Sequence, residues 1–415
     1  MSIKLYPKKI SGNVHIIGSK SESHRALIAS SLSEGKSTIE GLYSSKDVSA
    51  TRNALKKLGI SIIGDSIIGD TFYYNKSYID CDESGSTLRF LIPLSIHFFG
   101  EAFFTGKKRL FERPLDQYEE LFNFEFIDKS KTKLKITGNL KSKKFVLDSS
   151  KSSQFISGLL FVLPLLEGTS EIEFKSEIKS KSYINMTIEV LNKHNISISY
   201  KDNRLIIPGR QVYENFNHII EGDFSQAAYF FVAGTIGSPI SISNLNINSK
   251  QGDKKILEIL KEMGGNVIYE KKKFFIKPSK TRGIKIDLSD IPDLGPPLII
   301  LASLSEGTTS FYSVNRLKYK ESDRLIAMLK ILDKFKVKYK LYNNSLSIKG
   351  REWFEGNEVF STQGDHRIAM SLAIASIRCK KPIIIDDEGV VRKSFPNFFE
   401  IFKGLGGKYE KIRKL

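Results

Sequence analysis

Polar residues that could bind an anion recur where apolar helices are expected to begin. Six segments have this form: SKSESHRALIASSL from Ser19, SGSTLRFLIPLSI from Ser84, SSQFISGLLFVLPLL from Ser152, DFSQAAYFFVAG from Asp223, DLGPPLIILASL from Asp293 and DHRIAMSLAIAS from Asp365. The free N–H groups and the positive dipole end of a helix N-terminus attract phosphate and carboxylate. The simpler interpretation of any single hydroxyl or carboxylate at such a position is an N-cap.

Basic residues accompany these helix starts, and capping does not explain them. Cations in apolar helices are costly unless an anion pairs with them, and four lie in or beside these segments: Lys20, Arg25, Arg89 and Arg367. The segments FERPLDQY, KYKESDRL and VVRKSFPNFFE place further basic residues near the expected starts of second helices. In FERPLDQY we expect Pro114 at the first helical position, with Arg113 directly before it. A charged first turn is the alternative interpretation of KYKESDRL.

The helix starts belong to an internal repeat. They recur at intervals of 65 to 72 residues, so that six repeats account for the chain. Each first helix is followed by a short β-rich run, an amphipathic helix such as ESDRLIAMLKILDKF from Glu321, and short alternating strands. The predicted unit is strand–helix–strand–helix–strand–strand. Because the first helices are almost wholly apolar, we expect them to be buried with the sheets wrapped around them.

Length and composition favour a two-domain globular protein. A chain of 415 residues exceeds the usual size of one core, and 40% hydrophobic residues exclude a disordered chain. We expect one domain from residues 1–18 plus 222–415 and another from residues 19–221, with three repeats in each. The first strand should pair with the second half of the chain.

Location and partners are constrained by simpler features. No apolar run reaches membrane length, and the start of the chain lacks the pattern of a signal peptide. Only two cysteines occur, Cys81 and Cys379, which suits a reducing cytoplasm and excludes a disulfide framework. The net charge of +18 fits either a nucleic-acid-binding surface or an enzyme with anionic substrates.

The motifs resemble those of 5-enolpyruvylshikimate-3-phosphate synthase, in the same order and from about Lys4 to Gly406. KSESHRA, KESDRL and DHRIAM are specific in combination, and SGSTLR, RLFERPL, SSQFISGLL, KSYINMTI, GDFSQAAYFFVAG, IPDLGP and RKSFPNFFE accompany them. The resemblance implies an α/β fold, a two-domain inside-out α/β barrel in which three βαβαββ units per domain surround buried parallel helices. It also implies an active site in the cleft between the domains.

The implied reaction belongs to the shikimate pathway, which leads to chorismate and the aromatic amino acids. Phosphoenolpyruvate and shikimate-3-phosphate give the enolpyruvyl product and phosphate by addition and elimination through a tetrahedral intermediate. Converging helix ends, lysines and arginines suit two substrates that together carry two phosphates and two carboxylates. The resemblance implies no metal and no organic cofactor, no nucleic-acid partner and a monomer.

The resemblance also assigns roles to residues at matching positions. Asp293 is expected to accept the 5-hydroxyl proton, and Glu321 to donate to C3, with Lys20 as the competing donor. Shikimate-3-phosphate is expected to contact Lys20, Ser21, Arg25, Ser152, Ser153, Gln154, Ser180, Asp293 and Lys320. Phosphoenolpyruvate is expected to contact Lys20, Gly85, Arg113, Gln154, Arg324, Arg367 and Lys393. Tyr183 and His366 match cleft residues without a settled role.

Three segments depart from the family pattern. Glu83 stands where the family usually has Asn, and its carboxylate would repel phosphoenolpyruvate unless Lys or Arg neutralises it. Arg316 stands where an Asn often contacts shikimate-3-phosphate. The prolines Pro296 and Pro297 replace a commoner Ala/Met run, and the helix should persist because its first turn tolerates proline.

Two other functions remain as alternatives. The sister enolpyruvyl transferase that acts on UDP-N-acetylglucosamine typically uses a loop cysteine as acid, and neither cysteine here lies in a matching loop. A nucleic-acid-binding protein would need a stripe of basic and aromatic residues on one face. The basic residues at the motif positions are instead isolated at helix ends.

Overall fold

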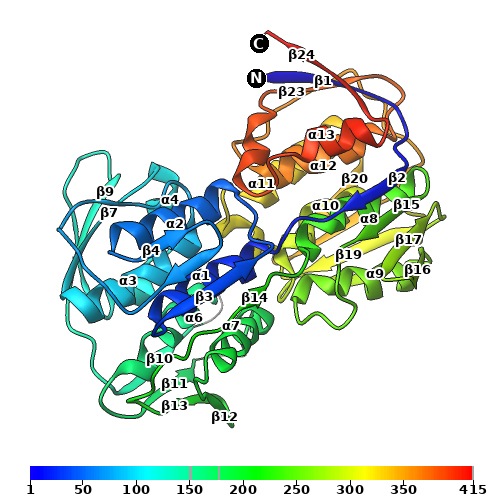
Figure 1. The fold of residues 1–415 in the computed structure, drawn as a ribbon. Helices are drawn as coiled ribbons and strands as arrows, with labels where there is room; N and C mark the ends of the chain where they lie inside the picture. Colours follow the sequence, from blue (N-terminus) through cyan, green and yellow to red (C-terminus); the bar gives the residue numbers. More distant parts are fainter. Residues whose placement is uncertain (149–151, 176–177, 414–415) are drawn as a thin grey trace. The chain divides into compact units, whose positions relative to one another are not determined.

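The computed structural model describes residues 1–148, 152–175 and 178–413, and the chain divides into two compact units (Figure 1). Unit 1 comprises Met1–Ile17 and Glu221–Leu415, and unit 2 comprises Gly18–Ile220. Within the described residues, each unit contains three four-stranded sheets and three buried helices.

Unit 2 contains the first three repeats. Its sheets, in order of strand pairing, are β14 (His218–Ile219), β3 (Lys36–Glu40), β5 (Ser66–Ile68) and β4 (Ser61–Ile63); β6 (Ile79–Asp80), β7 (Glu101–Thr105), β9 (Lys133–Thr137) and β8 (Asn123–Phe126); and β10 (Lys144–Leu147), β11 (Ser170–Phe174), β13 (Arg204–Ile207) and β12 (Ser199–Lys201). The helices are α1 (Lys20–Leu32), α2 (Lys46–Lys57), α3 (Gly85–Phe99), α4 (Lys108–Glu112), α5 (Asp116–Glu119), α6 (Gln154–Leu160), the 3₁₀ turn η1 (Leu163–Leu165) and α7 (Lys181–Lys193).

Unit 1 contains the other three repeats. Its sheets are β16 (Asn266–Glu270), β17 (Lys273–Lys277), β15 (Ile240–Ser243) and β2 (Gly12–His15); β18 (Lys285–Asp287), β19 (Thr308–Tyr312), β21 (Ser345–Lys349) and β20 (Lys338–Tyr342); and β22 (Val359–Phe360), β23 (Ile383–Ile385), β1 (Ser2–Tyr6) and β24 (Lys408–Ile412). The helices are α8 (Phe224–Ile236), α9 (Ile256–Glu262), α10 (Gly295–Ala302), α11 (Arg324–Lys334), α12 (His366–Ser376) and α13 (Phe398–Gly404), with the 3₁₀ helices η2 (Gly252–Lys255), η3 (Pro292–Leu294), η4 (Val314–Tyr319) and η5 (Gly389–Lys393).

Two short strands are exchanged between the repeats. In four sheets a strand, a buried helix and a parallel strand follow one another in the chain, as in β10–α6–β11. In the other two, β2 precedes α1 but pairs with β15, and β14 precedes α8 but pairs with β3. The prediction that the first strand pairs with the second half of the chain is confirmed, since β1 lies between β23 and β24.

The helices that begin at the six polar segments form the cores of the units. In unit 1, α8, α10 and α12 pack against one another, and every residue of α10 and α12 is buried. A helix that is apolar all round must be covered on every side, which explains why the sheets lie outside. Proline occupies the first turn of α10, and the helix persists as expected.

Among the described helices, none has both the length and the apolar character needed to cross a bilayer.

The segment around Arg113 differs from the prediction. Arg113 is the C-cap of α4, and α5 begins two residues beyond Pro114, so Pro114 is not the first residue of a helix. Arg113 has φ −76° and ψ 149°, the extended conformation that a following proline favours. The guanidinium therefore projects from a turn between two short helices rather than from a helix start.

Unit 2 contains a buried histidine pair that makes its stability depend on pH. The Nε2 atoms of His194, which follows α7, and His218, on β14, are 2.9 Å apart. The Glu214 carbonyl, 2.7 Å from His194 Nδ1, can only accept, so His194 donates from Nδ1 and His218 donates to the bare Nε2 of His194. Burial, with smaller effects of His194 and Lys193, lowers the pKa of His218 to about 3.

We expect the free energy of unfolding to fall as the pH drops below about 6.5. The unfolded chain then takes up a proton at His218, whereas the folded chain excludes it until its pKa of about 3. Near pH 5 the part of this loss that His218 causes is about 2 kcal/mol. The amide of His218→Gln can still donate to His194 but does not titrate. Between neutral pH and pH ~5, the free energy of unfolding of this variant should therefore fall by about 2 kcal/mol less than that of the unmodified protein. Urea unfolding of both proteins measures the difference, and equal losses would exclude His218 as the titrating group.

Candidate active site

The polar residues at the six helix starts divide into caps and residues with other partners. Ser19, Ser84, Asp223 and Asp365 accept backbone N–H groups from the first turns of α1, α3, α8 and α12. At α6 the N-cap is Ser153, which makes no side-chain cap bond, while Ser152 Oγ accepts the Gln154 N–H at 3.2 Å. Asp293 is not a cap, because it lies in η3 and α10 begins after Leu294. Its carboxylate is therefore available to cations.

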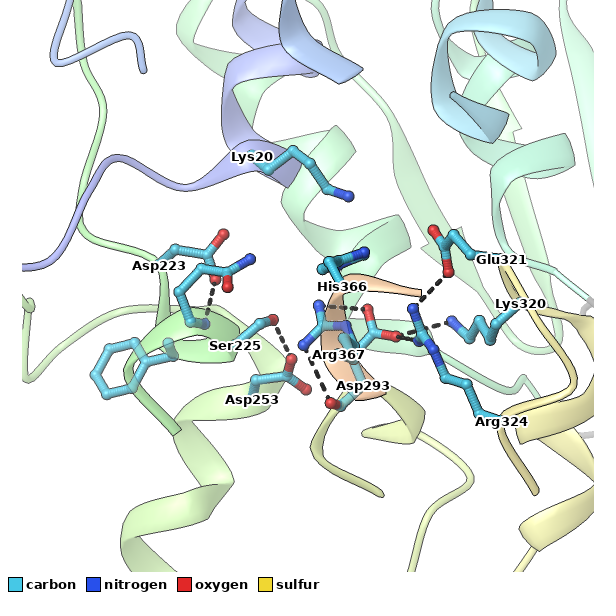
Figure 2. A network of polar contacts seen from close by, with 12 residues as sticks. Lys20, Asp223, Ser225, Asp253, Asp293, Lys320, Glu321, Arg324, His366 and Arg367 are labelled. Atoms are coloured by element: carbon cyan, nitrogen blue, oxygen red, sulfur yellow. Dashed lines mark hydrogen bonds and ion pairs between the residues drawn. The ribbon is translucent and has the colours of Figure 1, made fainter. Parts of the chain in front are cut away.

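Six charged residues of unit 1 form one network, which we call the Arg324 cluster: Asp293, Lys320, Glu321, Arg324, Asp365 and Arg367. Figure 2 labels all of them except Asp365. Arg324 begins α11 and is 1% exposed. Its Nη1 donates to Asp293 Oδ1 at 2.8 Å, its Nε to Asp365 Oδ2 at 2.8 Å, and its Nη2 to Glu321. The KYKESDRL segment is thus more than a charged first turn, since its arginine joins three carboxylates from different elements.

Asp293 is the point at which the cations of the cluster converge. Besides Arg324, its carboxylate contacts Lys320 Nζ at 3.2 Å and Arg367 Nη2 at 3.3 Å. Arg367 Nη1 also donates to the Asp293 carbonyl at 3.2 Å. The Asp293 side chain is 18% exposed, so a ligand could reach it.

The cations determine the charge of Asp293. Burial alone would raise its pKa, but Arg367, Lys320 and Arg324 outweigh burial and hold the pKa well below its usual value. Burial lowers the pKa of Lys320, which Asp293 partly offsets. Asp293 is therefore an ionised carboxylate, and any anion that drew the cations away from it would raise its pKa and make it a stronger base.

In unit 2, two arginines closely approach Gly85, the first residue of α3, and Gln154 contacts one of these arginines and Ser86. Arg89 donates from Nη1 to Gln154 Oε1 at 3.2 Å and from Nη2 to the Pro114 carbonyl at 2.6 Å. Gln154 Nε2 donates to Ser86 Oγ at 2.9 Å. A Cβ atom at Gly85 would lie 2.6 Å from Arg113 Nη1 and 2.7 Å from Arg89 Nη1. Glycine is therefore required for the close approach of both guanidiniums.

Two buried arginines of unit 2, Arg25 and Arg89, contact neutral oxygens and aromatic rings. Arg89 stacks over the Phe155 ring at 5.2 Å as well as donating to neutral oxygens. Arg25 donates to Thr187 Oγ1 at 2.8 Å and to the Ser21 carbonyl at 2.7 Å, and it stacks over Phe90. Carbonyl oxygens and aromatic faces thus compensate for the desolvation of both guanidiniums.

The remaining predicted residues have the following environments. Lys20, at the start of α1, pairs with Asp47 at 2.8 Å. Ser180 is the N-cap of α7 and has φ 54°, an uncommon conformation for serine. Lys393 is buried at the end of η5, which packs against α12. Lys107 forms an ion pair with Glu83, which neutralises the carboxylate that departs from the family pattern.

Sequence analysis missed three acidic residues of these networks. Asp47 lies in α2, where the local sequence indicates only an amphipathic helix, yet it forms an ion pair with Lys20. Asp365 was read as a cap, and it does cap α12, but it also accepts from Arg324. Asp253 lies in η2, at the start of the segment GDKKILEILKEMGG, where the local sequence indicates only an amphipathic helix. In each case the partner is distant in the sequence, so local patterns could not identify it.

Comparison with known proteins gives consistent matches along the chain. Residues 5–402 match the family model of EPSP synthase (3-phosphoshikimate 1-carboxyvinyltransferase). Proteins named 3-phosphoshikimate 1-carboxyvinyltransferase from Clostridium kluyveri and Clostridium acetobutylicum are 43% and 44% identical, over 98% of this chain and 98% and 97% of theirs.

Solved structures show the same fold. EPSP synthase from Acinetobacter baumannii aligns with a TM-score of 0.82 at 24% identity, over 99% of this chain and all of the other. The enolpyruvyl transferase NikO from Streptomyces tendae aligns with a TM-score of 0.80 at 14% identity, over 99% of this chain and 98% of its own. The predicted fold class is thereby confirmed. Within the described residues, no group of three or more His, Cys, Asp or Glu side chains is arranged to hold a metal ion.

Proposed function

Because this chain belongs to the EPSP synthase family, we propose that it transfers the enolpyruvyl group of phosphoenolpyruvate to the 5-hydroxyl of shikimate-3-phosphate and releases phosphate. The observation that best supports the proposal is a partly exposed, ionised Asp293 that contacts Lys320, Arg324 and Arg367. These cations match an anionic donor, and the carboxylate is the base that a hydroxyl nucleophile needs.

In the proposed addition step, the 5-hydroxyl oxygen forms a bond to C2 of phosphoenolpyruvate while Asp293 takes its proton. The anionic substrate draws Arg324 and Arg367 toward its own oxygens, which releases Asp293 from the contacts that lower its pKa. C3 takes up a proton to become a methyl group, with Glu321 or Lys20 as the donor. In the elimination step, C3 gives up a proton, the C2–O bond to phosphate breaks, and phosphate leaves.

The proposed binding roles are shared by the two units. Shikimate-3-phosphate is held by hydroxyl and amide groups at helix starts, by two cations and by the base itself: Lys20, Ser21, Arg25, Ser152, Ser153, Gln154, Ser180, Asp293 and Lys320. Phosphoenolpyruvate is held by Lys20, Gly85, Arg113, Gln154, Arg324, Arg367 and Lys393. The contacts of Arg113 and Gln154 around Gly85 support this division, since they place N–H donors beside a residue without a side chain.

Two features support related proposals about specificity and location. Both cysteines are free and buried, and burial raises the pKa of Cys379 to about 12. Neither thiol is therefore placed as the acid that the UDP-N-acetylglucosamine enzyme uses, and the names of the relatives do not favour that alternative. Free cysteines also support a reducing compartment, and we propose a monomeric enzyme in the cytoplasm.

A coupled phosphate-release assay tests the proposed function. With both substrates present, phosphate should be released continuously. Omission of either substrate should reduce release to the background rate. Equal release without shikimate-3-phosphate would identify a phosphatase and contradict the transfer reaction.

We expect Gly85→Ala to weaken the binding of phosphoenolpyruvate more than the binding of shikimate-3-phosphate. The new Cβ would displace Arg113 and Arg89, whose Nη1 atoms lie within 2.7 Å of its position. Loss of one charged hydrogen bond is expected to raise the KM for phosphoenolpyruvate about 10- to 150-fold. Gly404→Ala is the matched control, because a Cβ at Gly404 meets nothing within 4 Å. An equal rise in both KM values for Gly85→Ala would contradict the placement of phosphoenolpyruvate beside Gly85.

A further inference from the structure

Asp253 is a buried carboxyl group beside the Arg324 cluster to which the proposed mechanism gives no role. It lies in η2 and is 3% exposed. One oxygen, Oδ2, accepts the hydroxyl hydrogen of Ser225 from the first turn of α8. The other, Oδ1, is buried and has no hydrogen-bond partner among the described residues. Figure 2 shows the carboxyl group on the side of the cluster where Asp293 and Arg367 lie.

An ionised carboxylate is poorly accommodated in these surroundings. Buried charge is stable only when it is paired, and no ion pair to Asp253 is found among the described residues. A protonated carboxyl needs no counter-charge and loses less on desolvation. The geometry by itself thus favours the neutral acid.

The charged groups around Asp253 have opposing effects on its ionisation. Asp293, from η3, and Asp223, at the start of α8, oppose its ionisation, while Arg367, from α12, favours it. The neighbouring Lys254 is turned away, with its Nζ 3.1 Å from the Ile247 carbonyl. Burial has the largest effect, followed by Asp293, and together they raise the pKa of Asp253 to about 7, against the smaller opposing effects of Arg367 and Ser225.

The proton on Asp253 therefore affects what Arg367 can bind. When Asp253 is neutral, Asp293 is the carboxylate that contacts the Arg367 guanidinium, at 3.3 Å. When Asp253 ionises, a second negative charge acts on the same guanidinium and on any anion bound there. We propose that Asp253 is a positioning residue whose protonated form keeps Arg367 available to the anionic donor substrate, and whose ionised form weakens donor binding. This inference rests on the proposed function, since it takes phosphoenolpyruvate to be the donor.

The test is the pH dependence of the KM for phosphoenolpyruvate, measured by phosphate release between about pH 6 and pH 9. For the unmodified protein, KM should rise about three- to thirtyfold as the pH passes 7, from the repulsion of one added charge in a partly buried site. In Asp253→Asn the amide oxygen can still accept from Ser225, but the group cannot ionise, so the rise should disappear. Ionisation of the substrate itself affects both proteins equally and cancels in the ratio of their KM values.

A second variant tests the inference even if Asp253→Asn does not fold. The Ser225 hydroxyl stabilises the ionised carboxylate, so Ser225→Ala should raise the pKa of Asp253 and move the rise in KM to higher pH. Asp323→Asn is the matched control, because Asp323 caps α11 and an asparagine preserves the cap. A parallel rise in the unmodified protein and Asp253→Asn, or an unshifted rise in Ser225→Ala, would overturn the inference. An unmodified protein that releases no phosphate at any pH would instead contradict the proposed function.

Discussion

Asp293→Asn is expected to lower kcat by about 10²–10⁴-fold, because an amide cannot accept the 5-hydroxyl proton and loss of a general base has effects of this size. The asparagine retains the shape of the side chain and an oxygen that Arg324 and Lys320 can donate to. It does not retain the charge that holds three cations together, so some loss of thermal stability should accompany the loss of turnover. Turnover and the thermal midpoint are measured on one preparation.

A matched variant separates catalysis from folding in this experiment. Asp323→Asn makes the same chemical change thirty residues further along the chain, at a residue that only caps α11. It should keep turnover and stability close to those of the unmodified protein. If Asp293→Asn retained more than about a tenth of the original turnover, Asp293 would not be the base.

Arg324→Met is expected to destabilise unit 1 by about 3–5 kcal/mol, the cost of breaking a buried ion pair by removing one partner. The arginine is 1% exposed and joins three carboxylates, and Asp365 among them is fully buried. Methionine fills a similar volume but leaves Asp293, Glu321 and Asp365 facing one another without their shared cation. Urea unfolding at neutral pH measures the change in the free energy of unfolding.

Arg204→Met is the control for the loss of an arginine. Arg204 pairs with Glu171 and Glu173 on the surface of unit 2, and its side chain is 40% exposed. Solvent already screens such pairs, so the expected loss is at most about 1 kcal/mol. A similarly small loss of stability in Arg324→Met would show that the three carboxylates are stable without Arg324. It would contradict the conclusion that the Arg324 cluster stabilises unit 1.

The elements that position the site were predictable because their signal is local. An apolar helix such as α10 or α12 can only be buried, and its polar start marks the end where charged residues gather. The role proposed for Asp293 comes from the family motif. The local pattern suggested an N-cap, which is wrong, because η3 places Asp293 one residue before the cap of α10. The role proposed for Arg113 likewise comes from the family resemblance and not from periodicity.

What the sequence did not predict depends on partners that are distant along the chain. The strands β2 and β14 have four and two residues, too short for a recognisable alternation, and their exchange depends on β15 and β3, more than 170 residues away. Arg89 contacts Gln154, the Pro114 carbonyl and the Phe155 ring, three groups that come from other segments of the chain. The environment of Asp253 likewise exists only after three repeats have packed together.

The most direct test of addition and elimination is the reaction run in D₂O with product analysis by proton NMR. If C3 of phosphoenolpyruvate takes up a solvent proton to form a methyl group and then loses one, the vinyl group of the product must carry deuterium. We expect deuterated enolpyruvyl product and one phosphate released for each transfer. Product with a vinyl group free of deuterium, or phosphate release without an enolpyruvyl product, would contradict the tetrahedral intermediate and the roles proposed for Asp293, Glu321 and Lys20.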